Sequence, residues 1–203
     1  MRIRAALLDM DGTIFDSRID WLGLRKKIRI PWDGRPILAQ LRDAHSDVRE
    51  EGIALLHEAE RTGAENGELI PGTYEILELL RRHSVLCALI TNNSRRSAQT
   101  VLGRYCLPFD LVLTRDDGAA KPDPEVFLRA LAELEVDPAE TVAIGDAHLD
   151  VIAAHRAGIR EVILVATPAW MREHIPPDAA YRAAADLVEA GQILEGLLAP
   201  EAN

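Results

Sequence analysis

Seven polar residues stand at or just beyond the ends of short apolar runs, and their side chains are of types that act together in catalysis. They are Asp9, Asp11, Thr91, Asn92, Lys121, Asp146 and Asp150. The four carboxylates would repel one another in one place unless positive charge balanced them. Oxygen ligands without histidine or cysteine favour a hard cation such as Mg²⁺, and the lysine would add a second positive charge. A set of this kind suits phosphoryl transfer, in which a carboxylate attacks and positive charges neutralise the transferring group.

The apolar runs have the pattern of strands that are buried on both faces, as in a parallel sheet. They span residues 3–9, 85–91, 110–114, 141–145 and 161–166. Segments with helical periodicity lie between them, and strands that alternate with helices predict an α/β fold with a doubly wound parallel sheet. Because ligands bind at the carboxyl ends of the strands in such sheets, we expect the seven polar residues to meet at one edge.

The stretch from about residue 18 to residue 70 interrupts this alternation with helix-like segments and two breaks that contain proline or glycine. We therefore expect a small all-helical insertion after the first strand. Beyond residue 167 the pattern weakens, and we expect residues 181–198 to form one or two closing helices.

Composition limits the classes of partner and the compartment. The chain has 203 residues, 48% of them hydrophobic, which is enough for one sizeable core and an insertion. A formal net charge of −10 argues against nucleic-acid and anionic-membrane partners. No segment has the length of a membrane span, and Asp9 breaks the first apolar run, unlike a signal peptide. We expect a cytoplasmic protein in which Cys87 and Cys106 are buried, reduced thiols.

Four segments of the chain resemble, in sequence and in order, the motifs of the haloacid dehalogenase superfamily. Its phosphatases carry an aspartate-x-aspartate-glycine-threonine signature, which "DMDGT" at 9–13 matches. The second, third and fourth motifs are matched by "LITN" at 89–92, "KPDPEVF" at 121–127 and "IGDAHLD" at 144–150. The resemblance implies a phosphatase with a Rossmann-like core domain and a cap domain over the active site.

The position of the cap follows from the spacing of the motifs. The family places caps after the first motif or between the second and third, and the segment from Asn92 to Lys121 has room for only one helix and one strand. The resemblance therefore implies a core of residues 1–16 and 72–203 and a helical cap of residues 17–71. A cap that closes over the site favours a small soluble phosphomonoester, and the arrangement is most similar to the phosphoglycolate phosphatase group.

The resemblance implies a catalytic role for each matching residue. Asp9 would be the nucleophile that forms an aspartyl-phosphate, and Asp11 would protonate the leaving oxygen and then activate water. Thr91, with the Asn92 amide, would hold a phosphoryl oxygen, and Lys121 would offset the developing charge. Dehalogenases of the superfamily lack an acid at the second position because a halide needs no proton, so Asp11 favours phosphate ester cleavage.

The same resemblance implies the ligands of the magnesium ion. They would be Asp9, the backbone carbonyl of Asp11 and the side chain of Asp146. Asp150 would position metal-bound water or Lys121 rather than bind the ion directly.

Two other functions compete with a phosphatase. A phosphosugar mutase, an isomerase of the same family, uses the same four motifs and returns the phosphoryl group to a sugar, but the mutases have a longer segment after the first motif. A non-catalytic binding protein on this scaffold would have lost a motif residue, and none is lost here. The motifs do not identify which phosphomonoester is the substrate, and they do not indicate the oligomeric state.

Several further residues have a structural interpretation that we prefer over a functional one. We expect His148 to lie at the surface or the rim of the site rather than to act as a ligand. The basic run 25–29 is expected to be a solvated helix face rather than an approach for an anionic substrate. Trp21 and Trp32 are expected to pack between cap helices rather than to contact the leaving group.

Overall fold

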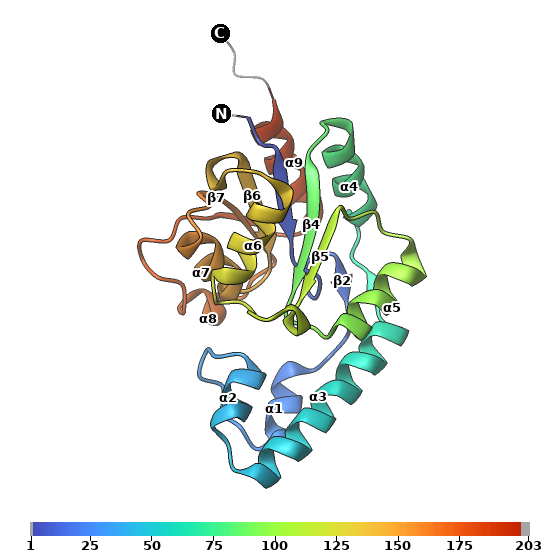
Figure 1. Ribbon diagram of the computed structural model, residues 1–203, viewed down its shortest axis with the longest axis vertical. Helices are drawn as coiled ribbons and strands as arrows, with labels where there is room; N and C mark the ends of the chain where they lie inside the picture. The colour runs from blue at the N-terminus through green and yellow to red at the C-terminus, as the bar shows by residue number, and fades with distance from the viewer. Residues whose placement is uncertain (1, 200–203) are drawn as a thin grey trace.

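A six-stranded sheet forms the centre of the computed structural model, which describes residues 2–199 (Figure 1). In spatial order its strands are β5 (Leu111–Thr114), β4 (Leu86–Thr91), β1 (Ala5–Leu8), β6 (Thr141–Gly145), β7 (Glu161–Val165) and β8 (Arg182–Ala184). All neighbouring pairs are parallel, so the carboxyl ends of all six strands lie along the same edge. The predicted α/β fold with a doubly wound parallel sheet is confirmed, including all five predicted strands.

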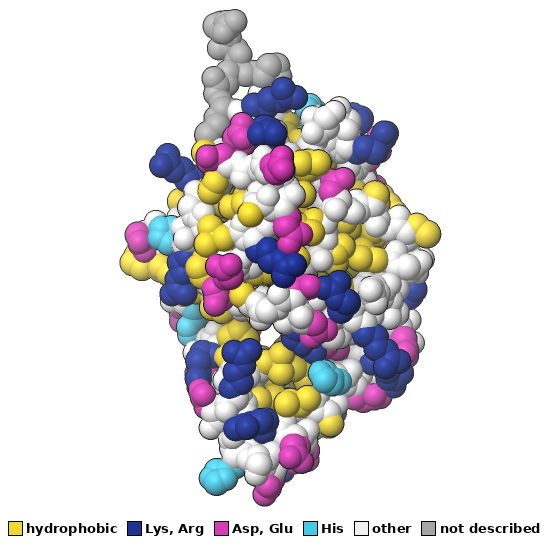
Figure 2. Space-filling model, in the orientation of Figure 1, with side chains coloured by type: hydrophobic (Ala, Val, Ile, Leu, Met, Phe, Trp, Pro, Cys, Tyr) yellow, Lys and Arg dark blue, Asp and Glu magenta, His cyan; other side chains and the backbone are white. Residues whose placement is uncertain are grey.

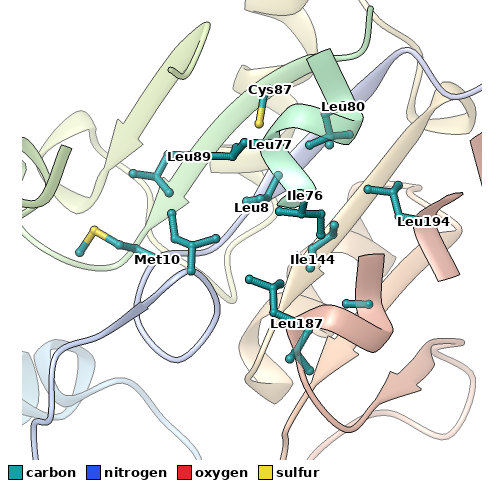
Figure 3. Packing of buried hydrophobic residues seen from close by; sticks show 14 of the residues in the cluster. Leu8, Met10, Ile76, Leu77, Leu80, Cys87, Leu89, Ile144, Leu187 and Leu194 are labelled. Carbon is teal, nitrogen blue, oxygen red and sulfur yellow. The ribbon is translucent and has the colours of Figure 1, made fainter. Parts of the chain in front are cut away.

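Helices cover both faces of this sheet, because successive strand residues point to opposite sides. One face carries α4 (Thr73–Arg82), α5 (Arg95–Tyr105) and α9 (Leu187–Leu198), which pack on Leu8, Leu89 and Ile144 (Figure 3). The other face carries α6 (Glu125–Leu134) and α7 (His148–Arg156), which pack on Leu7 and Ile90. The two hydrophobic clusters therefore hold the strands in place from both sides.

The prediction for residues 181–198 was partly wrong. Only α9 is helical there, while β8 pairs in parallel with β7 at the edge of the sheet. The three residues of β8 are Arg, Ala and Ala, which carry no strand pattern of their own, so their conformation depends on pairing with β7. Short elements complete the core: the 3₁₀ turns η1 (Arg115–Asp117) and η2 (Pro138–Glu140), and helix α8 (Ala169–Arg172).

Residues between β1 and α4 form the helices α1 (Trp21–Ile28), α2 (Ile37–Asp43) and α3 (Ser46–Asn66). A two-stranded antiparallel ribbon of β2 (Phe15–Asp16) and β3 (Glu68–Leu69) closes the base of this insertion. The three helices bury a small cluster of their own, which is separate from the two clusters of the sheet. Figure 1 shows them beyond the carboxyl edge of the sheet, with the long α3 reaching back beside α5.

Cys87 is buried on β4 as predicted, but Cys106 is exposed, because it ends α5 in the left-handed conformation and turns away from the core. Among residues 2–199, none of the helices has both the length and the apolar character that a membrane crossing requires.

Candidate active site

Lys121 and three aspartates meet at the carboxyl edge of the sheet. The ammonium of Lys121 donates to Asp9 Oδ1 at 2.6 Å, to Asp150 Oδ1 at 2.6 Å and to the carbonyl of Ile90 at 2.8 Å. Carboxylate oxygens of Asp9, Asp146 and Asp150 lie within 4.8 Å of one another. Asp9 follows β1 and the other two follow β6, its neighbour in the sheet, so parallel pairing brings their side chains together.

The electrostatics of this group show a shortage of positive charge. Burial raises the pKa of Asp9 to about 7, although Lys121 lowers it. Burial, and then the charges of Asp9 and Asp150, raise the pKa of Asp146 well above its usual value. Burial alone would lower the pKa of Lys121, but the charges of Asp150 and Asp9 outweigh it and raise that pKa. One ammonium does not balance three buried carboxylates, so the group favours taking up a proton or a cation.

The donors in this group fit a magnesium ion. They are carboxylate oxygens with no cysteine or histidine among them, which is the ligand chemistry of a hard divalent cation. Gly12 brings the turn of the first motif against the group: it has a φ of +79°, and a Cβ there would lie 2.2 Å from Asp146 Oδ2. Only glycine permits this approach without a shift of the carboxylate or of the backbone.

Asp11 lies outside this carboxylate group and is held separately. Its Oδ2 accepts a hydrogen bond from Asn93 Nδ2 at 2.5 Å, while its Oδ1 is buried without a hydrogen-bond partner in the described part of the chain. Burial raises the pKa of Asp11 to about 6. A carboxyl group with this pKa exchanges a proton near neutral pH, as a general acid and base requires. Asn93 was not predicted, because an asparagine that follows a strand is an ordinary turn residue.

Thr91 and Asn92 end β4 beside Lys121. The hydroxyl of Thr91 accepts a hydrogen bond from the backbone N–H of Asn93 at 3.1 Å. The side chain of Asn92 accepts from the backbone N–H of Lys121 and donates to its carbonyl, both at 2.8 Å. These two bonds fix the backbone that carries the lysine, so a contact of Asn92 with a phosphoryl oxygen would use its backbone N–H.

A buried ion pair joins α3 to the loop after β5. Both guanidinium Nη atoms of Arg115 donate to the carboxylate of Glu60, one of them at 2.9 Å, and Nη1 also donates to the carbonyl of Asn92 at 3.0 Å. The backbone N–H of Arg115 donates to the carbonyl of Asn93. The insertion is thereby linked to the loop whose Asn93 holds Asp11. Neither Glu60 nor Arg115 was predicted to be a functional residue, because both lie outside the four motifs. They also lie in elements that are far apart along the chain.

The expected surface position of His148 was wrong, whereas its not acting as a ligand stays a prediction. Its side chain is buried, with 2% of the residue exposed, and Nε2 donates to the carbonyl of Gly34 at 2.7 Å. The expectation for the basic run was wrong for Arg25, which is buried and donates to the carbonyls of Pro31 and Arg35 at 3.1 and 2.6 Å. The other three basic residues of the run are exposed as predicted. In both cases hydrogen bonds with the loop 29–36 accompany the burial of the side chain.

A cavity of about 1150 Å³ lies between the sheet edge and the insertion. Asp9, Asp11, Lys121 and Asp146 line its floor, and residues of α1 and α2 line the other side. Figure 2 shows the surface hollowed at this place, with hydrophobic side chains visible on the side of the insertion. The candidate catalytic groups therefore face a half-open cavity between the sheet edge and the insertion.

Comparison with known proteins agrees with this arrangement. A family model described as haloacid dehalogenase-like hydrolase matches residues 30–165, which include the second, third and fourth motifs. Validoxylamine A 7′-phosphate phosphatase of Streptomyces hygroscopicus subsp. limoneus is 31% identical over 81% of this chain and 86% of that protein. Phosphoglycolate phosphatase 1 of Pseudomonas aeruginosa is 29% identical over 77% and 67%. A hydrolase from Pseudomonas syringae shares the fold, with a TM-score of 0.78, 21% identity, and coverage of 97% of this chain and all of that one.

Proposed function

The chain belongs to the haloacid dehalogenase-like hydrolases, and on that premise we propose that it is a magnesium-dependent phosphatase. It would hydrolyse a small phosphorylated metabolite, a phosphomonoester, through an aspartyl-phosphate. The observation that supports this most directly is the convergence of Asp9, Lys121, Asp146 and Asp150 at one edge of the sheet, inside a cavity.

Asp9 is proposed as the nucleophile. It lines the cavity, and the ammonium of Lys121 holds its Oδ1, which favours the ionised form that attacks phosphorus. The Asp9 oxygen forms a bond to phosphorus while the bond from phosphorus to the leaving oxygen breaks. Thr91 and the backbone N–H of Asn92 would hold a phosphoryl oxygen, and Lys121 would neutralise charge on the transferring group.

The magnesium ion is assigned to Asp9, Asp146 and the backbone carbonyl of Asp11. When bound, it would neutralise phosphoryl oxygens and allow the carboxylates to stay ionised together. Asp150 already accepts from Lys121 and from the backbone N–H of Ala147 at 3.0 Å, so we assign it to positioning Lys121. In this arrangement Asp150 would hold the ammonium of Lys121 in place beside Asp9 while the substrate binds.

Asp11 is proposed as the acid and base. In the first step its carboxyl proton passes to the leaving oxygen, so the alcohol departs neutral. In the second step its carboxylate takes a proton from water, whose oxygen attacks phosphorus and breaks the bond to Asp9. The hydrogen bond from Asn93 fixes one carboxyl oxygen and leaves the other for this proton.

We assign residues 17–71 to a cap domain and residues 1–16 and 72–203 to the core. Two observations support this division, namely the separate hydrophobic cluster of α1–α3 and the ribbon β2–β3 at its base, while the ion pair of Glu60 with Arg115 links the two parts. A closed cap keeps bulk water from the aspartyl-phosphate until the alcohol has left.

Substitution of the nucleophile tests the function. With Mg²⁺ and an aryl phosphate, the native protein is expected to release phosphate, and Asp9→Asn to lower kcat by about 10⁴-fold or more. Asn has nearly the same shape, so circular dichroism should show an intact fold. Asp178→Asn, which changes an exposed carboxylate outside the cavity, is the matched control and should keep native kcat. Full activity in Asp9→Asn would refute the proposed role of Asp9.

A phosphosugar mutase is the second candidate, because the beta-phosphoglucomutase of Bacillus subtilis is 28% identical over 77% of this chain and 81% of that protein. The two activities differ in their products. Incubation with a hexose phosphate and a bisphosphate activator separates them: isomerisation without free phosphate indicates a mutase, and stoichiometric phosphate release indicates a phosphatase.

A further inference from the structure

Beyond the acidic group the cavity is lined by the aromatic side chains of Trp32, His148 and Trp170, which we call the aromatic wall, and His174 packs against Trp32 and His148. We propose that the leaving group of the substrate is a cyclic polyol, such as a sugar or cyclitol ring, and that it packs against Trp170 and Trp32. This inference rests on the proposed function and adds the class of substrate.

Contacts from both sides fix Trp32 in this wall. Its ring meets Trp170 edge-on, with centroids 4.9 Å apart and planes at 85°, and its Nε1 donates to His174 Nε2 at 3.3 Å. On the insertion, the guanidinium of Arg25 lies 4.9 Å from the centre of the same ring. Trp32 was expected to pack between cap helices, but it packs against residues of the core. Trp170 lines the cavity and is 41% exposed, so its ring has surface to offer to a ligand.

The wall begins next to the acidic group. His148 lies two positions after Asp146, is almost completely buried, and its ring centroid is 5.9 Å from that of Trp32. A group esterified to a phosphoryl bound at Asp9 would therefore extend along this wall. The wall is placed to contact the leaving group rather than the phosphoryl group.

The size of the cavity leaves room for a ring as well as for a short chain. Its 1150 Å³ is at or above the upper end of ligand sites, which span about 300–1,000 Å³ and hold drug-sized molecules. A two-carbon leaving group would leave most of the lining unfilled. Leu38 and the 47%-exposed Leu22 add further apolar surface to the lining, so an occupant gains if it has apolar faces of its own.

The charges of the lining favour a neutral, hydroxylated ring. Arg42 and Arg156 line the cavity together with Asp20 and Asp123, so donors and acceptors of both signs are present. A hydroxyl group can donate to the carboxylates and accept from the guanidinium groups. A second anion on the leaving group would be attracted by the guanidinium groups but repelled by the carboxylates. A cyclic polyol combines apolar ring faces for the indoles with hydroxyls for these groups.

Phosphate release from two kinds of ester tests the inference. The ring esters are glucose 6-phosphate and inositol 1-phosphate, and the acyclic esters are phosphoglycolate and glycerol 3-phosphate, each with Mg²⁺. We expect the native protein to have a kcat/KM about tenfold or more higher for the better ring ester, a difference of about 1.4 kcal/mol. Trp170→Ala should remove most of this preference, chiefly by raising KM for the ring ester.

Two further variants control for folding and for a purely structural wall. Trp170→Phe keeps an aromatic face and should retain the ring preference within about threefold. Leu128→Ala changes a residue of α6 that is as exposed as Trp170 but lies outside the cavity, and it should leave the preference unchanged. If the wall only holds the insertion on the core, Trp170→Ala will lower kcat for ring and acyclic esters by the same factor, and the inference fails.

The remaining outcomes separate this inference from the proposed function. Efficient turnover of phosphoglycolate or of glycerol 3-phosphate over both ring esters would refute the polyol assignment and leave the phosphatase intact. Absence of phosphate release from every ester would refute the phosphatase and the inference with it.

Discussion

The acidic edge of the sheet and the insertion side of the cavity are built in different ways. At the sheet edge, Asp9 and Asp146 directly follow the strands β1 and β6, Lys121 lies in the loop after η1, and Asp150 lies in the first turn of α7. Hydrogen bonds join Lys121 to Asp9 and Asp150, and pairing of β1 with β6 sets the spacing of the two segments.

On the insertion side, Arg25 and Glu60 lie in α1 and α3, and Trp32 lies in the loop between α1 and α2. Trp32 and Glu60 contact His174 and Arg115, which are far along the chain, whereas Arg25 donates to backbone carbonyls of the nearby loop. We therefore expect the positions of the candidate catalytic groups to depend mainly on the backbone of the sheet edge. The shape of the cavity on the insertion side should depend mainly on side-chain packing.

This difference predicts that substitutions at the sheet edge abolish turnover, whereas those on the insertion side alter stability and selectivity. Apart from Asp9→Asn, the largest effect is expected from Lys121→Met, because Asp9 and Asp150 would lose their shared buried partner. We expect kcat to fall by about 10³-fold or more. Breaking a buried ion pair costs about 3–5 kcal/mol, so urea unfolding should show a large loss of stability as well.

The next largest effect is expected from Gly12→Ala. A methyl group at Gly12 meets the carboxylate of Asp146 at 2.2 Å, at a φ that disfavours side chains. We expect Mg²⁺ to bind about 10- to 100-fold more weakly, as magnesium titration by calorimetry would measure. Gly103→Ala is the matched control, since a Cβ there meets nothing within 4 Å and an alanine suits α5. Unchanged magnesium affinity in Gly12→Ala would contradict the placement of the ion beside Asp146.

The stability of the protein without magnesium should depend on pH in a defined direction. The pKa values of Asp9 and Asp11 are raised to about 7 and about 6, and that of Asp146 is raised too, so the folded state binds more protons than the unfolded state. The free energy of unfolding in EDTA should therefore fall as pH rises from about 4 to about 7, by up to about 1.4 kcal/mol per pH unit for each group.

Added Mg²⁺ should oppose this loss, so its stabilising effect should grow over the same pH range. Urea unfolding with EDTA and with Mg²⁺ at several pH values measures both effects. Asp9→Asn, which removes one of the groups, should give a shallower dependence in EDTA. A stability that rises with pH in EDTA would show that the carboxylates are not protonated in the folded protein.

Glu60→Gln tests the insertion side and should have the smallest effect. Gln keeps the shape of the side chain but removes the charge that faces Arg115, and one buried hydrogen bond to a charged group contributes about 1.5–3 kcal/mol. We expect a stability loss of this size, with kcat reduced far less than in Lys121→Met. A loss of turnover as large as that of Lys121→Met would show that the insertion takes part in the chemical step.

Much of the acidic edge could be predicted from the sequence, because it depends on local patterns. Apolar runs identify strands, and polar residues directly after them lie at strand ends wherever the strands are placed in the sheet. Parallel order then brings Asp9, Lys121, Asp146 and Asp150 together. The helical insertion was predictable for the same reason, from its interruption of the strand pattern.

The contacts between segments far apart along the chain were decided only by the tertiary structure. Asn93 holds Asp11 across 82 positions, His148 donates to Gly34 across 114, and Trp32 reaches His174 across 142. Asn93, His148 and His174 do not differ by type or periodicity from ordinary turn or helix residues. Their burial and partners arise from how the insertion lies on the core, and that packing depends on the free energy of the whole chain rather than on local propensity.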